Sequence, residues 1–174
     1  MDEITYLESK IRDIYDFPKP GVVFKDITPL LADVQATKQV LDLFLKRLDG
    51  KKIDKIIGME SRGFFFGTLL AQRLGAGFVP VRKPGKLPFE TIAQTYDLEY
   101  GQDQLEIHSD SIKKGENVLI HDDVLATGGT AEAAVKLVET LGGNIVQLNF
   151  LIELTFLKGV QKLGNHEVYS ILKY

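Results

Sequence analysis

The chain has no cysteine, only 3 histidines and no long apolar run, and each shortage excludes a class of protein. Without cysteine it forms neither disulfide bonds nor thiolate metal sites, which fits a reducing, cytoplasmic setting. The histidines are too scattered for a histidine metal site: His108, His121 and His166. No apolar run is long enough to span a bilayer, and the acidic, amphipathic start MDEITYLESK is unlike a signal peptide. We therefore expect neither a membrane segment nor a metal site built from protein side chains.

Charge and length set further limits. A net charge of −3 argues against a general nucleic-acid surface, although it does not exclude an anionic small substrate, because local charge decides such binding. The 174 residues are 44% hydrophobic and 26% charged, as in an ordinary globular protein with a substantial core. No internal repeat or low-complexity tract is visible. We expect a single domain over residues 1–174.

Short apolar runs alternate with amphipathic stretches, which is the pattern of an α/β protein. The pattern predicts helices over Glu3–Tyr15, from Thr37 to Leu48, from Gly63 onward, from Thr130 to Leu141 and over Phe156–Leu163. It predicts strands over Ile53–Gly58, Gly77–Val81, Val118–Ile120, Asn144–Glu153 and Glu167–Leu172, and a weaker one over Leu105–His108. This alternation indicates a mostly parallel, twisted sheet with flanking helices, which binds ligands at the carboxyl ends of its strands.

The stretch Asn117–Leu141 has the geometry of an anion site. Its apolar strand leads into Asp122 and Asp123 and then into a loop of small residues: Ala126, Thr127, Gly128, Gly129 and Thr130. A strand, loop and helix in this order present free N–H groups to an anion, and glycines allow close approach of the backbone. The loop is neither a Walker A motif nor a G-x-G-x-x-G motif. Because ionised carboxylates only accept hydrogen bonds, the acidic pair suits sugar hydroxyls, and the stretch predicts a ribose 5-phosphate site.

A second strand–turn–helix junction contains Glu60, Ser61 and Arg62. Its N–H groups and the arginine side chain can bind a second anion. The alternative is that Arg62 forms a salt bridge to Glu60 or to another neighbour. Further along, cations accompany two prolines and a glycine, which is the electrostatic complement of a pyrophosphate: Arg82, Lys83 and Lys86.

Two irregular segments are candidates for covering a pocket. Residues 16–24 contain two prolines and a glycine, so they form a stiff path that either holds Val23, Phe24 and Lys25 over a flat base or buries its own apolar side chains. Residue types alone do not choose between these readings. Residues 83–101 form a long excursion, either a lid that excludes water or a solvated basic hairpin.

These motifs resemble those of type I phosphoribosyltransferases, which bind phosphoribosyl pyrophosphate. The Asp-Asp…Gly-Gly-Thr motif marks that family as a whole. Four segments in the same order and spacing resemble its adenine-specific members: residues 17–26, 60–64, 81–88 and 96–101. The resemblance covers nearly the whole chain.

The resemblance implies that the chain converts adenine and phosphoribosyl pyrophosphate to AMP and pyrophosphate in purine salvage. It implies an N-terminal helix and a base-binding hood over residues 1–36, a mobile lid loop over residues 82–101 and a homodimer. Pyrophosphate leaves readily only when its charge is neutralised, so Mg²⁺ is expected, bound mainly through substrate oxygens and water.

The resemblance assigns four groups of site residues. The catalytic group is Glu99, acting as a general acid toward the base, with Tyr100 and Arg62. Ribose and its 5′-phosphate are expected at Asp122, Asp123 and the loop 126–130. Pyrophosphate is expected at Glu60, Ser61, Arg62, Arg82, Lys83 and Lys86, with Arg82 or Lys86 serving the partner subunit. Adenine is expected at Val23, Phe24, Lys25 and Val124.

His121 stands where the family more often has an aliphatic residue. We expect it to be a packed or hydrogen-bonded core residue, near enough to the acidic pair to influence its charge.

Two other functions stay open. The base could be guanine, xanthine or orotate, because backbone contacts near Phe24 leave no side-chain code, although the proline-rich segment favours adenine. The chain could instead be a regulatory binding protein that keeps the fold as a sensor. Such proteins usually carry an added DNA-binding domain, for which this chain has neither room nor a basic face.

Overall fold

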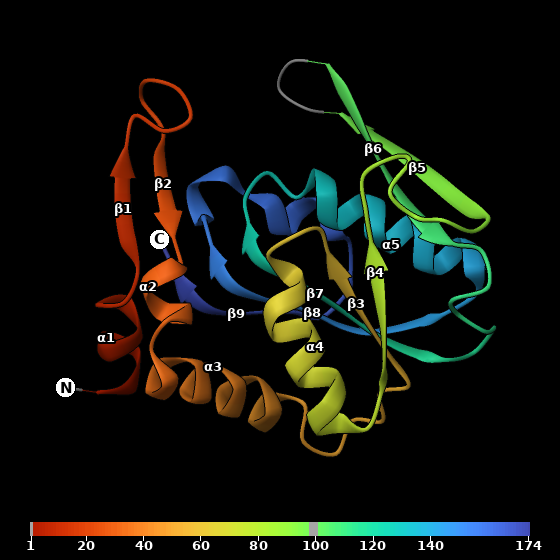
Figure 1. Cartoon of the computed structure of the whole chain (residues 1–174), viewed down its shortest axis with the longest axis horizontal. Helices are drawn as coiled ribbons and strands as arrows, with labels where there is room; N and C mark the ends of the chain where they lie inside the picture. Colours follow the sequence, from red (N-terminus) through yellow and green to blue (C-terminus); the bar gives the residue numbers. More distant parts are fainter. Residues whose placement is uncertain (1, 98–100) are drawn as a thin grey trace. The chain divides into compact units, whose positions relative to one another are not determined.

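The computed structural model describes residues 2–97 and 101–174, which form two compact units (Figure 1). The first unit ends at Leu48, and the second runs from Asp49 to Tyr174. Glu99 and Tyr100, expected to be catalytic, lie outside the described residues. Within the described ranges, no helix has the length and apolar character needed to cross a membrane.

The first unit contains α1 (Glu3–Glu8), β1 (Arg12–Tyr15), β2 (Val23–Asp26), α2 (Thr28–Leu31) and α3 (Val34–Arg47). The predicted helix over Glu3–Tyr15 is wrong beyond Glu8. Residues 12–15 pair antiparallel with β2, because the partner strand supplies backbone hydrogen bonds that outweigh the helical spacing of the apolar residues. The helix predicted from Thr37 begins earlier because the Asp33 side chain caps the first turn of α3.

The second unit is built on a five-stranded parallel sheet in the order β4 (Gly77–Val81), β3 (Lys55–Met59), β7 (Asn117–Leu125), β8 (Asn144–Glu153) and β9 (Val168–Lys173). This confirms the predicted α/β fold with a parallel sheet. The short strand predicted over Val118–Ile120 continues to Leu125. Asp122 and Asp123 therefore lie inside β7 and do not follow it, because their backbone continues the pairing with β8.

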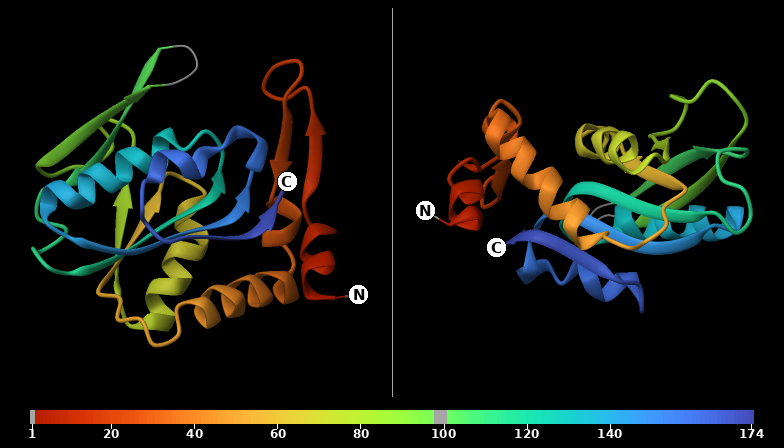
Figure 2. Two further views of the ribbon diagram at one scale, coloured as in Figure 1. Left: turned by 180° about the vertical axis from the view of Figure 1, so that it is seen from behind. Right: turned by 90° about the horizontal axis from the view of Figure 1, so that it is seen from below.

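The two crossover helices position the site. Helix α4 (Gly63–Leu74) joins β3 to β4, and α5 (Gly129–Leu141) joins β7 to β8. These connections step in opposite directions along the sheet, and right-handed crossovers then place the two helices on opposite faces (Figure 2). The order of strands reverses between β3 and β7. Ligands of open α/β sheets bind at the carboxyl ends of the strands beside such a reversal.

Both faces of the sheet are packed with apolar side chains. Helix α5 buries Leu137 and Val138 in one cluster with Ile120 and Phe150 of the sheet. On the α4 face, Phe66 packs edge-on against His121 with ring centroids 6.4 Å apart. Burial of each large apolar side chain contributes about 1.5–3 kcal/mol, so the ends of β3 and β7 are held rigidly.

The predicted lid loop is partly regular structure. Strands β5 (Thr91–Asp97) and β6 (Gln102–His108) form an antiparallel pair, so residues 91–97 are not an irregular excursion. Whether this hairpin serves as a lid stays a prediction. The period-2 pattern of β5 was hidden because polar Gln94 stands between Ile92 and Tyr96 on its more buried face. The backbone of Arg82 bonds to that of Glu106, which ties the hairpin to the end of β4.

The connection between β8 and β9 differs slightly from the single helix predicted over Phe156–Leu163. It contains two short 3₁₀ helices, η1 (Thr155–Leu157) and η2 (Gly159–Leu163). Lys158 separates them with a positive φ of 55°, which interrupts a continuous helix.

Candidate functional site

The loop between β7 and α5 borders a hollow of about 70 Å³ that is open to solvent. Its lining contains most of the residues predicted to hold ribose 5-phosphate, together with Val124: Asp122, Val124, Ala126, Thr127, Gly128, Gly129 and Thr130. Leu125, Ala131 and Phe150 also line it and were not predicted, because apolar strand residues and a helical alanine look like ordinary scaffold. The structure thus brings the phosphate loop, one acidic residue and Val124 around one hollow.

The two glycines of the loop are required by different neighbours. Gly128 has a φ of 83°, and a Cβ added there would lie 2.4 Å from the carbonyl oxygen of Gly159. A Cβ at Gly129 would lie 3.2 Å from Cδ2 of Tyr96. The loop is therefore packed between η2 and the hairpin. Glycine at position 128 also has no side chain to cap the first N–H groups of α5, which leaves these donors for a ligand.

Asp122 and Asp123 are neighbours on β7, so their Cβ atoms leave opposite faces of the strand. Oδ1 of Asp122 nevertheless lies near the start of α4, 3.0 Å from a Cβ added at Gly63. Asp122 borders the hollow, whereas Asp123 is 2% exposed and its Oδ2 lies 2.8 Å from Nε of Arg62. Burial, and then the charge of Asp123, raise the pKa of Asp122 well above its ordinary value. Burial also raises the pKa of Asp123, and Arg62 opposes this. Hydroxyl donors of a bound sugar would favour the ionised pair.

The second junction meets the first at the same edge of the sheet, as predicted. A Cβ added at Gly63 would lie 2.8 Å from the carbonyl oxygen of His121, so the start of α4 touches β7 closely. The peptide bond between Glu60 and Ser61 is cis. The salt bridge that was the alternative for Arg62 does form, with Asp123 as its partner.

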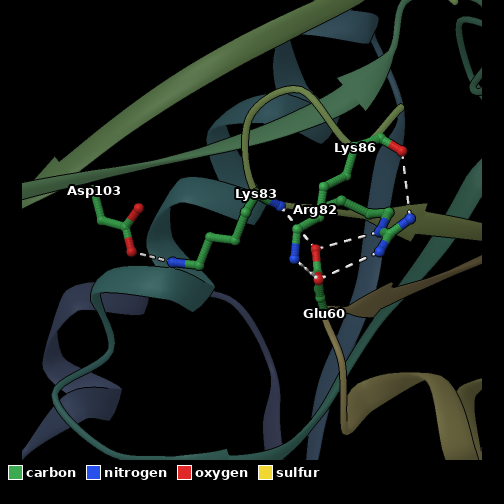
Figure 3. A network of polar contacts seen from close by, with 5 residues as sticks. All are labelled: Glu60, Arg82, Lys83, Lys86 and Asp103. Carbon is green, nitrogen blue, oxygen red and sulfur yellow. Dashed lines mark hydrogen bonds and ion pairs between the residues drawn. The ribbon is translucent and has the colours of Figure 1, made fainter. Parts of the chain in front are cut away.

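The Glu60 carboxylate forms ion pairs with two of the predicted cations, Arg82 and Lys86 (Figure 3). It accepts hydrogen bonds from Arg82 Nε at 3.2 Å, Lys86 Nζ at 2.5 Å and the backbone N–H of Lys83 at 3.0 Å. Burial opposes ionisation, but these donors lower the pKa of Glu60 to about 2. The two cations exceed the one carboxylate in charge. Glu60 therefore holds Arg82 and Lys86 in place, and its own part in binding pyrophosphate stays a prediction.

Lys83 does not join that cluster through its ammonium group. Its side chain points away from Glu60 and toward Asp103, with which it forms an ion pair (Figure 3). It also donates a hydrogen bond of 2.9 Å to the hydroxyl of Tyr96. Both partners belong to the hairpin. Their contacts with Lys83 could not be read from the sequence, because they depend on the register of β5 against β6.

The residues predicted to bind a base lie on β2 of the first unit. Val23 is 40% exposed, and the ring of Phe24 meets that of Phe17 edge-on at a centroid distance of 5.2 Å. The ammonium group of Lys25 forms an ion pair with Asp13 at 2.7 Å. Lys25 would therefore contact a base through its backbone.

His121 is a buried, hydrogen-bonded core residue, as predicted. Its Nδ1 lies 2.7 Å from Oδ1 of Asn149 on β8, and burial lowers its pKa to about 4. It therefore stays neutral near pH 7. Asn149 was not anticipated, because only the strand register reveals that it stands opposite His121.

Comparisons with known proteins agree with this geometry. The family model of the phosphoribosyl transferase domain matches residues 30–161. The adenine phosphoribosyltransferase of Christiangramia forsetii is 64% identical over 168 residues, which are 97% of this chain and 98% of the relative. The chain belongs to the adenine phosphoribosyltransferase family. The enzyme of Flavobacterium johnsoniae is 62% identical, over 97% of this chain and 99% of the relative.

Solved structures of adenine phosphoribosyltransferases share the fold. The structure from Thermoanaerobacter pseudethanolicus has a TM-score of 0.96 and 53% identity, over 98% of this chain and 99% of that one. The structure from Saccharomyces cerevisiae, in complex with adenine and an imino-altritol bisphosphate, has a TM-score of 0.94 and 45% identity, over 98% of both chains. The predicted resemblance to type I phosphoribosyltransferases is confirmed.

Proposed function

We propose that this chain transfers the phosphoribosyl group of phosphoribosyl pyrophosphate to adenine, which forms AMP and pyrophosphate in purine salvage. It is thus a pentosyltransferase. The observation that carries this function is the hollow at the end of β7, where a phosphate loop and an acidic residue lie together. The high identity to enzymes named adenine phosphoribosyltransferase supports the choice of base.

Residues around the hollow take the ribose 5-phosphate. The N–H groups of Gly128, Gly129 and Thr130, with the Thr127 hydroxyl, bind the 5′-phosphate at the positive end of α5. Asp122 and Asp123 accept hydrogen bonds from the ribose hydroxyls. The close fit of Gly128 against Gly159 supports this assignment because it holds the loop in one conformation.

Pyrophosphate binds at the second junction. Arg62 and the N–H groups after Ser61 lie beside the acidic pair. Arg82 and Lys86 form ion pairs with Glu60. Lys83 adds a further cation, its ammonium group, when pyrophosphate is present. Attack of N9 of adenine on C1 of the sugar expels pyrophosphate through a transition state with positive charge on the sugar, and the N–H proton that adenine loses leaves with pyrophosphate or water. The chain acts mainly by positioning the reactants and stabilising charge.

A divalent cation, Mg²⁺, accompanies the substrate. The donor chemistry beside the hollow fits it, because Asp122 offers hard carboxylate oxygens of the kind that Mg²⁺ binds. One carboxylate would leave most ligand positions open, so substrate oxygens and water would supply the other ligands. When bound, the cation neutralises the charge of the departing pyrophosphate. Chelation with EDTA is expected to stop AMP formation, and added Mg²⁺ to restore it.

Adenine-binding roles are assigned to Val23, Phe24, Lys25 and Val124 on the resemblance. Val23 is exposed on β2, and Val124 lines the hollow. We assign the general acid toward the base to Glu99, assisted by Tyr100, on the resemblance alone. Residues 1–36 act as the hood, and residues 82–101 act as the lid that excludes water. A cytoplasmic location stays a prediction.

A substrate panel tests this function. Purified protein with phosphoribosyl pyrophosphate and Mg²⁺ is offered adenine, guanine, xanthine or orotate, and both nucleotide and pyrophosphate are measured. We expect AMP from adenine and no nucleotide from the other bases. Release of pyrophosphate with another base and not with adenine would show that the substrate is that other base. Binding of adenine and phosphoribosyl pyrophosphate without release of pyrophosphate would favour the sensor reading. The matched control is Asp122→Asn with Asp123→Asn, which is expected to abolish turnover.

The active form is a homodimer. Phe65 and Leu69 are 46% and 45% exposed on consecutive turns of α4, and such apolar faces are typical of protein interfaces. Sedimentation of Phe65→Ser with Leu69→Ser is expected to show a monomer, whereas Phe156→Ser, which alters another exposed aromatic residue, stays dimeric. A further test uses mixed dimers of two inactive variants, one altered at Asp122 and one at Arg82 or Lys86. Activity returns in the mixed dimer if these cations serve the partner subunit, because one complete site then forms.

A further inference from the structure

Tyr96 of β5 touches the phosphate loop with its ring. The ring is 8% exposed and belongs to the apolar cluster beneath α5. A Cβ added at Gly129 would meet Cδ2 of Tyr96 at 3.2 Å and the carbonyl oxygen of Asp97 at 3.3 Å, so the strand lies directly against the loop. Gly129 thus serves two purposes, as a donor for the 5′-phosphate and as the space into which the hairpin packs.

The hydroxyl at the other end of the same side chain contacts the pyrophosphate side of the site. It accepts a hydrogen bond of 2.9 Å from the Lys83 ammonium group and donates one of 3.1 Å to Oδ2 of Asp103. The ammonium group also lies 5.4 Å from the centroid of the Tyr96 ring. Lys83 is therefore held by a carboxylate, a hydroxyl and an aromatic face, all from one hairpin.

Tyr96 is thus the one side chain, among the described residues named in this site, that contacts both the phosphate loop and a predicted pyrophosphate ligand. We infer that Tyr96 is a positioning residue that fixes Lys83 relative to the phosphate loop, and so sets the separation of the two phosphate-bearing ends of phosphoribosyl pyrophosphate. This inference rests on the proposed role of Lys83. It predicts that the ring and the hydroxyl act on different ends of the substrate.

The test compares two ligands that each occupy one end of the site, inorganic pyrophosphate and ribose 5-phosphate, by calorimetry in the presence of Mg²⁺. Tyr96→Phe keeps the ring against Gly129 and removes only the hydroxyl. We expect it to weaken pyrophosphate binding about fivefold, the usual worth of one hydrogen bond, and to leave ribose 5-phosphate within about twofold. Tyr96→Leu also removes the ring and is expected to weaken both ligands. The matched control, Thr95→Val on the exposed face of the same strand, is expected to change neither.

A double-mutant cycle separates positioning from a general structural effect. In a Lys83→Met background, Tyr96→Phe is expected to cause no further loss of pyrophosphate affinity, because the residue through which it acts is gone. An effect that persists in that background, equal weakening of both ligands, or no effect of Tyr96→Phe at all would each overturn the inference. If Lys83→Met itself leaves pyrophosphate binding unchanged, the proposed role of Lys83 is wrong and the inference falls with it. Thermal unfolding of each variant confirms that the comparison is made on folded protein.

Discussion

The charged side chains of this site are mainly paired with one another in salt bridges. Arg62 neutralises Asp123, and Glu60 neutralises part of the charge of Arg82 and Lys86. Such pairing makes charged groups tolerable where burial would otherwise be costly. It also means that removal of one partner leaves the other in an unfavourable state, so substitutions here are expected to have larger effects than the loss of one ligand contact.

Arg62→Ala is expected to raise KM for phosphoribosyl pyrophosphate by roughly tenfold or more, because it removes a donor for pyrophosphate and leaves the Asp123 carboxylate without that cation. The KM for adenine should change little. Steady-state kinetics with each substrate varied in turn measures both constants. Arg47→Ala, at the exposed end of α3, serves as the control and should behave as wild type. A loss confined to adenine would show that the assignment is wrong.

Glu99→Gln is expected to lower kcat by about 10²–10⁴-fold with little change in either KM, because a positioned general acid contributes that much to proton transfer. The variant keeps the size of the side chain and removes its proton. Glu90→Gln, an exposed residue just before β5, is the control for a charge lost near the hairpin. An unchanged kcat would remove Glu99 from the mechanism.

The 3₁₀ helix η2 carries none of the motifs on which the site was predicted, yet it packs closely against the site. The backbone of Gly159 lies against that of Ala126 and Gly128, so the phosphate loop rests on this 3₁₀ turn. The connection between β8 and β9 thus shapes a site whose named residues all come from other parts of the chain.

Gly159→Ala is expected to raise KM for phosphoribosyl pyrophosphate by about tenfold or more, since its Cβ would lie 2.2 Å from the Ala126 carbonyl oxygen and displace the loop. Calorimetry with AMP should show a parallel loss of affinity. Gln161→Ala alters an exposed side chain of the same turn and should leave both quantities unchanged. Wild-type affinity in Gly159→Ala would mean that the loop is not held from this side.

At the scale of the whole molecule, the neutral core histidine makes stability depend on pH. The pKa of His121 is about 4 in the folded chain against an ordinary 6.5, so the unfolded chain binds the proton more readily between these values. The contribution is complete above pH 6.5 and is lost as the pH falls toward 4. The loss is on the order of 3 kcal/mol.

Chemical denaturation at pH 7 and pH 5 measures this dependence. His121→Leu should be less stable than wild type at pH 7, because Asn149 loses its hydrogen-bond partner, yet should change less with pH. His166→Leu, which alters a histidine outside the core, should keep the wild-type dependence. Equal slopes in wild type and His121→Leu would assign the effect to other groups.

The sequence predicted the fold well because its strands and helices carry strong, separate apolar periods. It also predicted that the two junctions would meet, since parallel strands end at one edge of a sheet. It failed where pairing between distant segments decides the outcome: residues 12–15 became a strand through β2, and residues 91–97 through β6. For the same reason, Asp103 and Asn149 carried no signal. Side-chain partners that depend on register are not readable from local spacing.

The alternation of Asp122 and Asp123 across β7 has a consequence for how this chain can vary. Adding or deleting one residue between Asn117 and Ile120 would exchange the two carboxylates, so that the one facing the hollow would turn toward Arg62. Length changes in this strand should therefore abolish activity even in protein that still folds. The loop over residues 109–116, which precedes the strand, has no such alternation of faces to keep.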